Sequence, residues 1–548
     1  MPVDTITNRY KKEDEDADIR LLHEMGYVQE LYRGMSPFMS FTFCFTAMHV
    51  LASITLGFTS TLVTGGSAVA LYSWIIGSIF TVFVGLSLAE IASVYPSAGS
   101  VYHWAGQLVS IQQAPVMSFI CGWINFLGNV AGDAAYASGF ANVISSVFIA
   151  NDKPALSNGV QVAIGIFTLF LYAAQNALRI DQNGWMNNIA AIFQIVSSLV
   201  MVFVLYAGSE HKVTVYELFT STYNGTGFPF AYVCLIGILS ALFPLSGYEG
   251  NVRCLRYNWI EIILANIGGA HLAEETQNAS RAVPRGIVAT CLCSIVFGAI
   301  YLFALLFAIP NVKDFMAHHE GGNGKMNLAV ATYQLAVPGV GAQILIFILL
   351  INLYAGGMSS MTVSSRIGFS LARDGVFPYS SYLRRVYQKT KTPLVNIIFV
   401  FVLDALFVLS QLFSTGLFLC LVAIGTIGLQ ISYLMPILFR CTVARKTFAK
   451  GEFNLGVFGI PVAVISSIWL TLTSIIMFLP MRYPITIDNM NYTIVAFAGV
   501  FILAGGYWFF AARHWFVGPR RTDYTIPLLP AGGVHNEDKL TNESMLVE

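Results

Sequence analysis

The chain has 548 residues, of which 56% are apolar and only 11% are charged. Soluble domains carry about 25% charged residues, so this composition excludes a sizeable soluble domain and indicates a protein surrounded by lipid. Lys plus Arg and Asp plus Glu number 29 each, and no basic stripe, metal-spaced Cys/His cluster or phosphate loop suggests a nucleic acid, metal or nucleotide partner. The eight cysteines are scattered and mostly lie inside apolar runs, so no disulfide framework and no cofactor is expected.

A helix needs about 20 apolar residues to cross roughly 30 Å of hydrocarbon, and in lipid its backbone groups must be paired internally. We therefore predict an all-α integral membrane protein with about twelve transmembrane helices and polar tails at residues 1–37 and 517–548. The predicted spans are residues 38–63, 68–94, 114–147, 157–177, 185–208, 228–250, 285–309, 338–365, 393–413, 415–439, 459–480 and 492–516.

Positive charge in the connections predicts the orientation, because cytoplasmic loops carry an excess of Lys and Arg. With a cytoplasmic N-terminus and twelve spans, 22 of the 29 Lys and Arg residues lie inside and 5 lie outside. Arg253 and Arg256 are the other two. Both termini are therefore expected in the cytoplasm. The sequon at Asn224 would then lie outside, where it can be glycosylated, and the sequon at Asn278 would lie inside.

The first span contains a cluster of small, β-branched and glycine residues halfway across, between Met48 and Phe58. Such a cluster favours an unwound stretch whose free N–H groups could hold a carboxylate. An ordinary helix with small residues at a packing face explains the pattern equally well. The candidate substrate-binding residues of this stretch are Ala52, Ser53, Ile54, Thr55 and Gly57.

The third span carries Asn125, Asn129 and Asp133 at four-residue spacing, which puts them on one helix face. That face should look into the bundle rather than at lipid. Two further polar residues at depth are Asn352 in the eighth span and Asp404 in the ninth. Hydrogen bonding between helices explains these residues better than substrate contact does, and Asp404 is expected to be structural.

The sixth span is interrupted by Pro244 and two glycines, with a carboxylate, Glu249, between the glycines. An acid inside the membrane is costly and indicates a functional site. Glu249 could pair with a substrate ammonium group or carry a coupling proton; alternatively, it lies at the interface or is neutralised by Arg253. The candidate substrate-binding residues here are Ser246, Gly247, Tyr248 and Glu249, with Tyr248 as a candidate gate.

Three segments have distinctive sequences. Residues 87–102 read SLAEIASVYPSAGSVY, residues 270–287 read AHLAEETQNASRAVPRGI, and residues 365–378 read SRIGFSLARDGVFP. In this order and at these distances they resemble the motifs of the amino acid–polyamine–organocation transporters. The resemblance covers roughly residues 38–516.

The resemblance implies a leucine-transporter-type core. Residues 38–208 and 228–440 would form two inverted repeats of five helices, with helices one and six broken, and residues 459–516 would add two peripheral helices. Substrate would sit between the two breaks, with an amino acid placing its carboxylate at the first and its amine near the second. The motifs are most similar to the amino acid/choline branch, which includes GABA and choline permeases and bidirectional amino acid transporters.

Charged residues of these motifs fall near the cytoplasmic face in the predicted topology. They could pair across helices and act as an inward gate that breaks and reforms; fixed structural pairing explains any single pair equally well. The candidate gate residues are Glu90, Glu274, Glu275, Arg366, Arg373 and Asp374, with Arg281 and Arg285 nearby.

One segment departs from the family pattern. Residues 251–267 separate Gly-Tyr-Glu-Gly from Gly-Ala-His-Leu-Ala-Glu-Glu, two stretches that run almost directly together in the family. We therefore expect residues 251–267 to be an insertion or a translated intron. If present, it places Arg253 and Arg256 close to the binding centre, where a charge can cost a few kcal/mol.

The sequence is compatible with either a proton or a sodium ion as the coupling ion. The fifth span has no lysine, whereas some proton-coupled relatives use one there. Ser359 and Ser360 in the eighth span could supply oxygen ligands for sodium together with carbonyls of the first span, although small residues at a packing face explain them as well. Glu249 is the candidate for proton coupling.

The expected function is a secondary active transporter that moves amino acids, GABA, choline, polyamines or similar amines by alternating access. The alternative is a nutrient sensor that keeps this fold and moves nothing, although such sensors usually carry a long cytoplasmic extension. A membrane-embedded enzyme is not expected, because no metal set or nucleophile–base pair lies at matching depth. The plasma membrane is the expected location, with the vacuolar or another internal membrane as the alternative.

Overall fold

The computed structural model describes residues 42, 45–95, 97, 99–178, 180–209, 212–247, 279–320, 326–413, 417–486 and 490–521. Within these residues, ten helices are long and apolar enough to cross a membrane, and two shorter apolar helices span Phe230–Leu242 and Leu394–Ser410. Each predicted span thus contains a helix. The prediction of an all-α integral membrane protein is confirmed.

The helices within the predicted spans are α3 (Val50–Val63), α4 (Gly66–Val94), α6 (Ala114–Ala150), α7 (Asn158–Asn176), α8 (Ile180–Gly208), α10 (Phe230–Gly237) with α11 (Leu239–Leu242), α13 (Ala279–Phe307), α16 (Val340–Arg373), α18 (Leu394–Ser410), α19 (Leu417–Cys441), α20 (Gly459–Ile476) and α21 (Thr493–Phe510). The connections contain α5 (Ser100–Gln107), α9 (Val215–Thr220), α14 (Val312–Glu320), α15 (Leu328–Ala336), α17 (Ser380–Leu383) and two 3-10 turns, η2 (Gly456–Phe458) and η3 (Ala512–His514).

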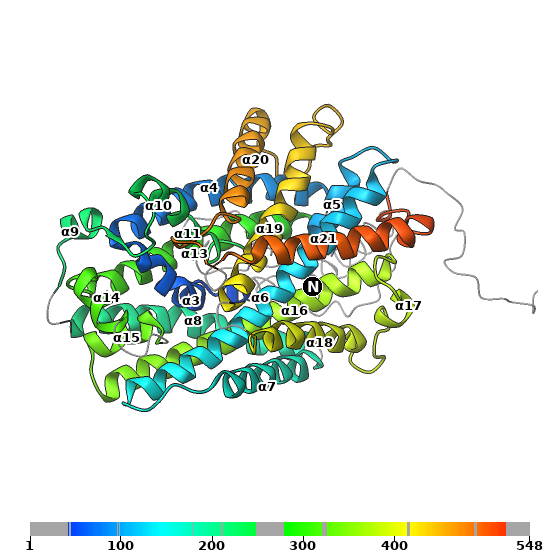
Figure 1. Ribbon diagram of the computed structural model, residues 1–548. Coiled ribbons are helices and arrows are strands. Elements are labelled where there is room, and N and C mark those ends of the chain that lie inside the picture. The colour runs from blue at the N-terminus through cyan, green and yellow to red at the C-terminus, as the bar shows by residue number, and fades with distance from the viewer. Residues whose placement is uncertain are drawn as a thin grey trace, which may run out of the picture.

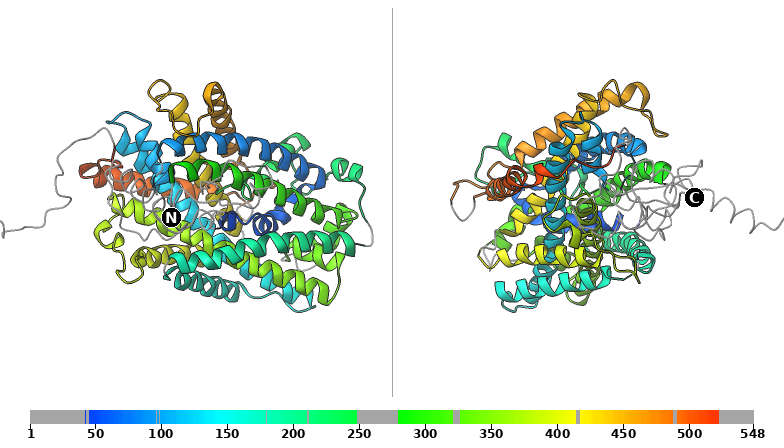
Figure 2. Two further views of the ribbon diagram at one scale, coloured as in Figure 1. Left: turned by 180° about the vertical axis from the view of Figure 1, so that it is seen from behind. Right: turned by 90° about the vertical axis from the view of Figure 1, so that its right-hand side faces the viewer.

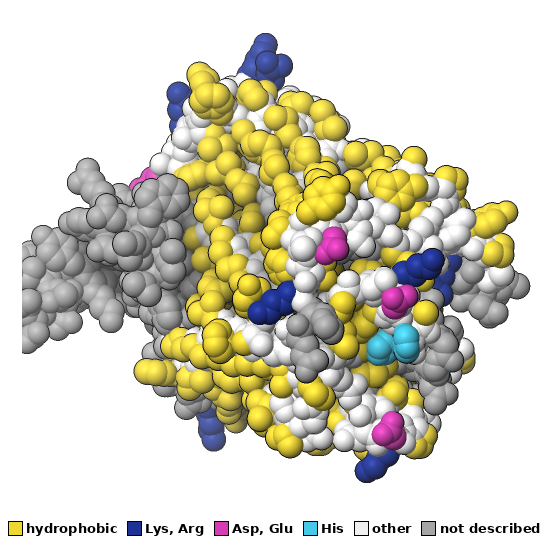
Figure 3. Space-filling model, turned by 90° about the vertical axis from the view of Figure 1, so that its left-hand side faces the viewer, with side chains coloured by type: hydrophobic (Ala, Val, Ile, Leu, Met, Phe, Trp, Pro, Cys, Tyr) yellow, Lys and Arg dark blue, Asp and Glu magenta, His cyan; other side chains and the backbone are white. Residues whose placement is uncertain are grey.

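The short helices of the connections gather at two opposite ends of the bundle (Figure 1). The α5 end carries α5 and α17, and the α9 end carries α9, α14 and α15. The first pair belongs to connections predicted to be cytoplasmic and the second group to connections predicted to be outside, so the alternation of the predicted spans is consistent with the structure. Seen from the α9 end, broad hydrophobic surface surrounds only sparse charged side chains (Figure 3).

Helix α6 runs through the centre of the bundle, where it packs most extensively against α19 and α16. On the other side, α13 packs against both α4 and α8, and the back view in Figure 2 shows these three helices running side by side. The long central helices therefore form a scaffold around α3, which has most of its residues buried.

A short β-ladder, which the helical prediction did not include, joins two connections at the α9 end. Strand β1 (Thr64–Gly65) pairs antiparallel with β2 (Tyr223–Asn224). Gly65 and Gly66 have φ of 129° and 72°, values that only glycine adopts readily. The ladder therefore ties the end of α3 to the segment that leads into α10.

The crossing of α6 and α19 depends on two glycines that face each other. A methyl group at Gly428 would lie 2.7 Å from Cα of Gly128, and one at Gly128 would lie 3.0 Å from Cα of Gly428. Because both neighbours are backbone atoms, neither could move aside. Small residues at such crossings let helix backbones approach closely in membranes.

We therefore expect Gly428→Ala to destabilise the protein by about 1–3 kcal/mol through overpacking, although alanine favours a helix by about 1 kcal/mol in open surroundings. Gly499→Ala in α21 is the matched control, because a methyl group there meets nothing within 4 Å. Thermal unfolding in detergent should show a lower midpoint for Gly428→Ala alone. Equal midpoints for the two variants would contradict this account of the crossing.

Candidate functional site

The first span is interrupted at one residue, His49. Residues 45–48 are helical, His49 has a left-handed backbone with φ 34° and ψ 61°, and α3 runs without a break from Val50 to Val63. The predicted interruption is present within residues 48–58, but it is confined to His49, and the predicted unwinding of the residues after it is wrong. The small residues after His49 serve helix packing, which was the alternative that the sequence left open. A left-handed residue other than glycine is uncommon, and such strain gathers at functional sites.

The carbonyl groups that the break leaves without helix partners are paired by side chains. The Met48 carbonyl accepts hydrogen bonds from Ser53 Oγ at 2.9 Å and Tyr136 OH at 3.0 Å. The Tyr136 hydroxyl also lies 3.2 Å from the Ala47 carbonyl and 2.8 Å from Ser53 Oγ. Since Tyr136 belongs to α6, the scaffold itself stabilises the break.

The His49 side chain is fully buried and extends from the break towards α16 and α8. Its Nε2 lies 2.9 Å from Oδ1 of Asn352, and Nδ2 of Asn352 donates to Ser197 Oγ at 3.0 Å. A methyl group at Gly356 would lie 2.9 Å from Cβ of His49, so a glycine is needed where α16 passes the break. Asn352 was expected to bond between helices, and it bonds to two of them.

The sixth span also leaves the helix, and it does so beside the first break. Helix α11 ends at Leu242, and Gly247 adopts φ 92°. The Gly247 N–H donates to the Tyr433 hydroxyl at 3.1 Å, and a methyl group at Gly247 would lie 3.8 Å from Cγ of Met48. The interruptions of the two spans are therefore neighbours.

A cavity of about 570 Å³ lies on the α9 side of these interruptions. It is lined by α3, α6, α7, α10, α11, α18 and α19, and by the connection that contains Asn491. Gly57 and Phe243 belong to its lining. The ring of Phe243 lies 6.3 Å from that of Tyr136 between centroids, so two aromatic rings lie between the cavity and the break.

The predicted residues of the first span do not share one face of α3. Ser53 bonds at the break, whereas Thr55 Oγ1 lies 2.8 Å from Tyr301 OH on α13. Ala52 and Ile54 are buried in an apolar cluster, and Gly57 lines the cavity. Among the candidates of the sixth span, Ser246 donates to the Leu242 carbonyl at 2.6 Å, and Gly247 lies at the interruption of that span. Tyr248 and Glu249 fall outside the described residues.

The polar row of the third span faces the bundle, as its spacing predicted. Asn125 and Asn129 are buried; Asn125 Nδ2 donates to Ser432 Oγ on α19 at 3.0 Å, whereas Asn129 donates to the Asn125 carbonyl. Asp133 and Asp404 are both fully buried. Their carboxyl oxygens have no hydrogen bond of normal geometry within the described ranges, and the Asp133 carboxyl group faces the hydroxyls of Ser360 and Ser364.

The two serines suggested as sodium ligands face different helices. Ser359 Oγ donates to Asn187 Oδ1 on α8, whereas the Ser360 hydroxyl faces Asp133 on α6. The two hydroxyls therefore face α8 and α6 rather than the first span.

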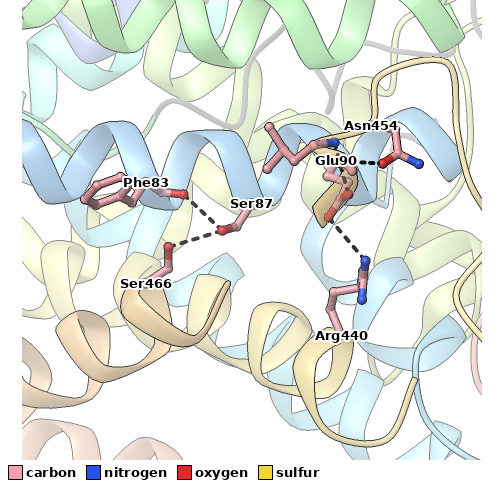
Figure 4. A network of polar contacts seen from close by, with 8 residues as sticks. Phe83, Ser87, Glu90, Arg440, Asn454 and Ser466 are labelled. Carbon is pink, nitrogen blue, oxygen red and sulfur yellow. Dashed lines mark hydrogen bonds and ion pairs between the residues drawn. The ribbon is translucent and has the colours of Figure 1, made fainter. Parts of the chain in front are cut away.

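Glu90 has a partner that the motifs did not predict. Its Oε2 forms an ion pair with Nη2 of Arg440 at 3.4 Å, which joins α4 to α19 (Figure 4). Its Oε1 accepts a hydrogen bond from the Leu455 N–H at 3.3 Å, and Ser87 of the same helix lies 3.1 Å from Ser466 on α20 (Figure 4). These contacts hold α4 against the last part of the helical bundle.

The other candidate gate residues divide into two groups. Arg366 is almost fully buried and its Nη1 donates to Ser365 Oγ at 3.0 Å, and Arg373 Nε lies 3.7 Å from Asp374 Oδ1. A second group has side chains or whole residues outside the described part of the chain: Glu274, Glu275, Arg281 and Arg285, with Asn278 of the inner sequon and Arg253 and Arg256 of the suspected insertion.

Sequence reasoning did not identify His49, Tyr136 or Gln194 as site residues. A signal existed for His49, because it is the only charged or ionisable nitrogen side chain in the apolar run of residues 38–63. Tyr136 and Gln194 carried no comparable signal, since their role depends on which helices meet at the break.

Comparison with known proteins is consistent with these features. A family profile described as "Amino acid permease" matches residues 36–258 and 264–501. The chain is 32% identical to the amino-acid permease BAT1 of Arabidopsis thaliana over 91% of this chain and 95% of that protein. It is 33% identical to the rice homologue of BAT1, over 91% and 94% of the two chains, and 28% identical to amino-acid permease 2 of Neurospora crassa, over 92% and 91%.

The Glu90–Arg440 ion pair generates a prediction about stability. Removing one partner of a buried pair leaves an uncompensated charge and costs roughly 3 kcal/mol. We expect Arg440→Gln to lower the thermal midpoint and Glu90→Gln/Arg440→Gln to recover part of the loss. Arg445→Gln, at an exposed position in the connection that follows α19, should change little. Losses that simply add in the double variant would show that the two side chains do not interact.

Proposed function

The chain belongs to the amino acid permease family, and on that premise we propose that it is a secondary active transporter of amino acids or related small amines such as GABA, choline or polyamines. Because the family and the relatives are permeases, the expectation that the chain is not an enzyme is confirmed. The proposal concerns the mechanism of alternating access and the place where substrate binds.

The observation that carries the proposal is the meeting of two interrupted spans below a cavity. Gly247 lies against Met48, and the cavity of about 570 Å³ reaches Phe243 beside them. Transporters of the inverted-repeat type bind substrate at such discontinuous helices. In this chain the substrate would enter from the α9 end, which is the outside face in the proposed topology.

The chemistry of the two helix ends suits an amino acid. The first N–H groups of α3 lack partners within their own helix and carry partial positive charge, so they suit a carboxylate. The C-terminal end of α11 carries partial negative charge and suits an ammonium group. Ser53, Ser246 and Gly247 lie at these ends, and we keep Tyr248 and Glu249 as proposed contacts to the amine.

Two gates complete the proposal. Phe243 and Tyr136 lie between the cavity and the break and would form the outer gate. The inner gate would use the charged residues of the cytoplasmic motifs. Of these, Arg366, Arg373 and Asp374 belong to the described part of the chain. Glu90 would hold its own helix to α19 through Arg440 while the gate opens.

Residues 251–267 stand apart from this machinery, and we propose that they are an insertion or a translated intron. The two matches to the family profile leave out residues 259–263, inside this segment. Sequencing of the mature transcript should give reads that join Gly250 to Gly268 or Gly269. Reads that run through codon 260 would establish the segment as part of the protein.

Transport itself is tested in proteoliposomes that contain the chain with and without residues 251–267. Saturable uptake of at least one member of a panel of labelled amino acids, GABA, choline and polyamines is expected, above the flux into empty liposomes. No flux for any member with either chain would support the sensor of the same fold instead.

Tyr136→Phe tests the break. The substitution leaves the Ala47 and Met48 carbonyls without the hydroxyl, and an unpaired buried polar group costs about 1–3 kcal/mol. We expect uptake to be roughly tenfold slower, since each 1.36 kcal/mol is a factor of ten in rate. Tyr354→Phe is the matched control. The Tyr354 hydroxyl donates a hydrogen bond of 2.9 Å to Gln175 Oε1 and takes no part in the pairing at the break. Equal rates for both variants would remove Tyr136 from the site.

A further inference from the structure

One imidazole nitrogen of His49, Nδ1, lacks a hydrogen-bond partner of normal geometry among the described residues. The side chain is fully buried, and its Nε2 is paired with Asn352 Oδ1 at 2.9 Å. The backbone of Thr46 and the side chain of Gln194 are the other polar groups beside the ring. A buried polar atom without a partner is rare in folded proteins and calls for an explanation. Neither the resemblance nor the break alone explains why the residue at this position is a histidine.

The hydrogen bonds of Asn352 determine which nitrogen of His49 carries the proton. Nδ2 of Asn352 donates to the Ile348 carbonyl at 2.8 Å, and a carbonyl can only accept, so the amide orientation is defined. Asn352 Oδ1 therefore faces His49 as an acceptor, and Nε2 must be the donor. In the neutral ring Nδ1 then carries the lone pair, which makes it a proton acceptor.

Gln194 on α8 provides the second observation. It is 1% exposed, and neither Oε1 nor Nε2 has a hydrogen-bond partner of normal geometry among the described residues, yet its amide faces His49. An amide can serve the ring in both states, because its NH₂ can donate to the bare Nδ1 and its oxygen can accept from a protonated Nδ1. The unpaired amide thus lies where an added proton would need an acceptor.

The groups around His49 provide no fixed counter-charge in the described structure. Helix α8 contributes the neutral Gln194 and Ser197, α16 contributes the neutral Asn352, and α6 contributes the phenol of Tyr136, with the carboxyl group of Asp133 one turn before it. On α13, Ser294 reaches the neighbouring Met48. No charged side chain among the described residues forms an ion pair or hydrogen bond with His49. An imidazolium would therefore gain most from an anion that arrives at the break.

We propose that Nδ1 of His49 is the proton-binding site that couples substrate movement to the proton gradient, an inference that rests on the proposed transport function. The ring takes a proton from water at the α9 end when the substrate carboxylate occupies the break, and it returns the proton to water at the α5 end after the substrate leaves. Each ligand stabilises the other by the same coupling free energy. The coupling thus follows from charge pairing within one site.

The test measures steady-state accumulation in proteoliposomes, using the labelled panel member with the highest counterflow. A gradient of one pH unit corresponds to 1.36 kcal/mol, so coupling to one proton accumulates substrate about tenfold in the unaltered protein. His49→Gln should lose accumulation, and its counterflow should need more substrate, because no imidazolium pairs with the substrate carboxylate. His103→Gln, at another fully buried histidine, bonded to Gln107 on α5, should accumulate substrate as the unaltered protein does.

The outcomes separate the two proposals. No counterflow in the unaltered protein contradicts transport itself, whereas counterflow without accumulation contradicts proton coupling alone. Tenfold accumulation by His49→Gln, or accumulation driven by a sodium gradient at equal pH, would overturn the role of His49.

If His49→Gln does not fold, Gln194→Leu decides the matter. This substitution removes the acceptor for the Nδ1 proton. Half-maximal stimulation of substrate accumulation by external protons should therefore require a lower external pH than in the unaltered protein. An unshifted midpoint would exclude the proposed site.

Discussion

Every backbone N–H and C=O group inside the membrane needs a partner, because hydrocarbon offers none. The break at His49 can exist only because the Met48 and Ala47 carbonyls receive hydrogen bonds from Ser53 and Tyr136. Because the Tyr136 hydroxyl bonds to these carbonyls, α6 must lie against the first span at that depth. The position of the break therefore depends on the scaffold helix as much as on the first span.

The same constraint shapes the surroundings of the break. Gly356 lets α16 approach His49, and the Tyr433 hydroxyl accepts the N–H of Gly247, which no longer belongs to a helix. Polar side chains thus occur where regular helix ends, and glycines occur where backbones approach. The interruptions of the two spans therefore lie next to each other, at the place where we propose that substrate binds.

Much of the architecture was readable from sequence, because runs of about 20 apolar residues and the glycine–proline cluster at residues 244–250 are strong local signals. The first break lies at one end of the predicted stretch, since small residues at positions 52–57 look alike whether they loosen a helix or pack it, and only contact with α6 decides. The pairing of Glu90 with Arg440 was also missed. Those residues are 350 positions apart, and one chain carries no information on such a pairing.

We propose that substrate binds between the break at His49 and the end of the helix at Leu242. Electron cryo-microscopy of the protein with a transported amino acid bound would locate the ligand relative to these two positions. We expect ligand density whose carboxylate reaches the first N–H groups of α3 and whose amine faces residues 243–247. Density confined to the cavity on the α9 side of Phe243, or a first span that is helical through His49, would contradict it.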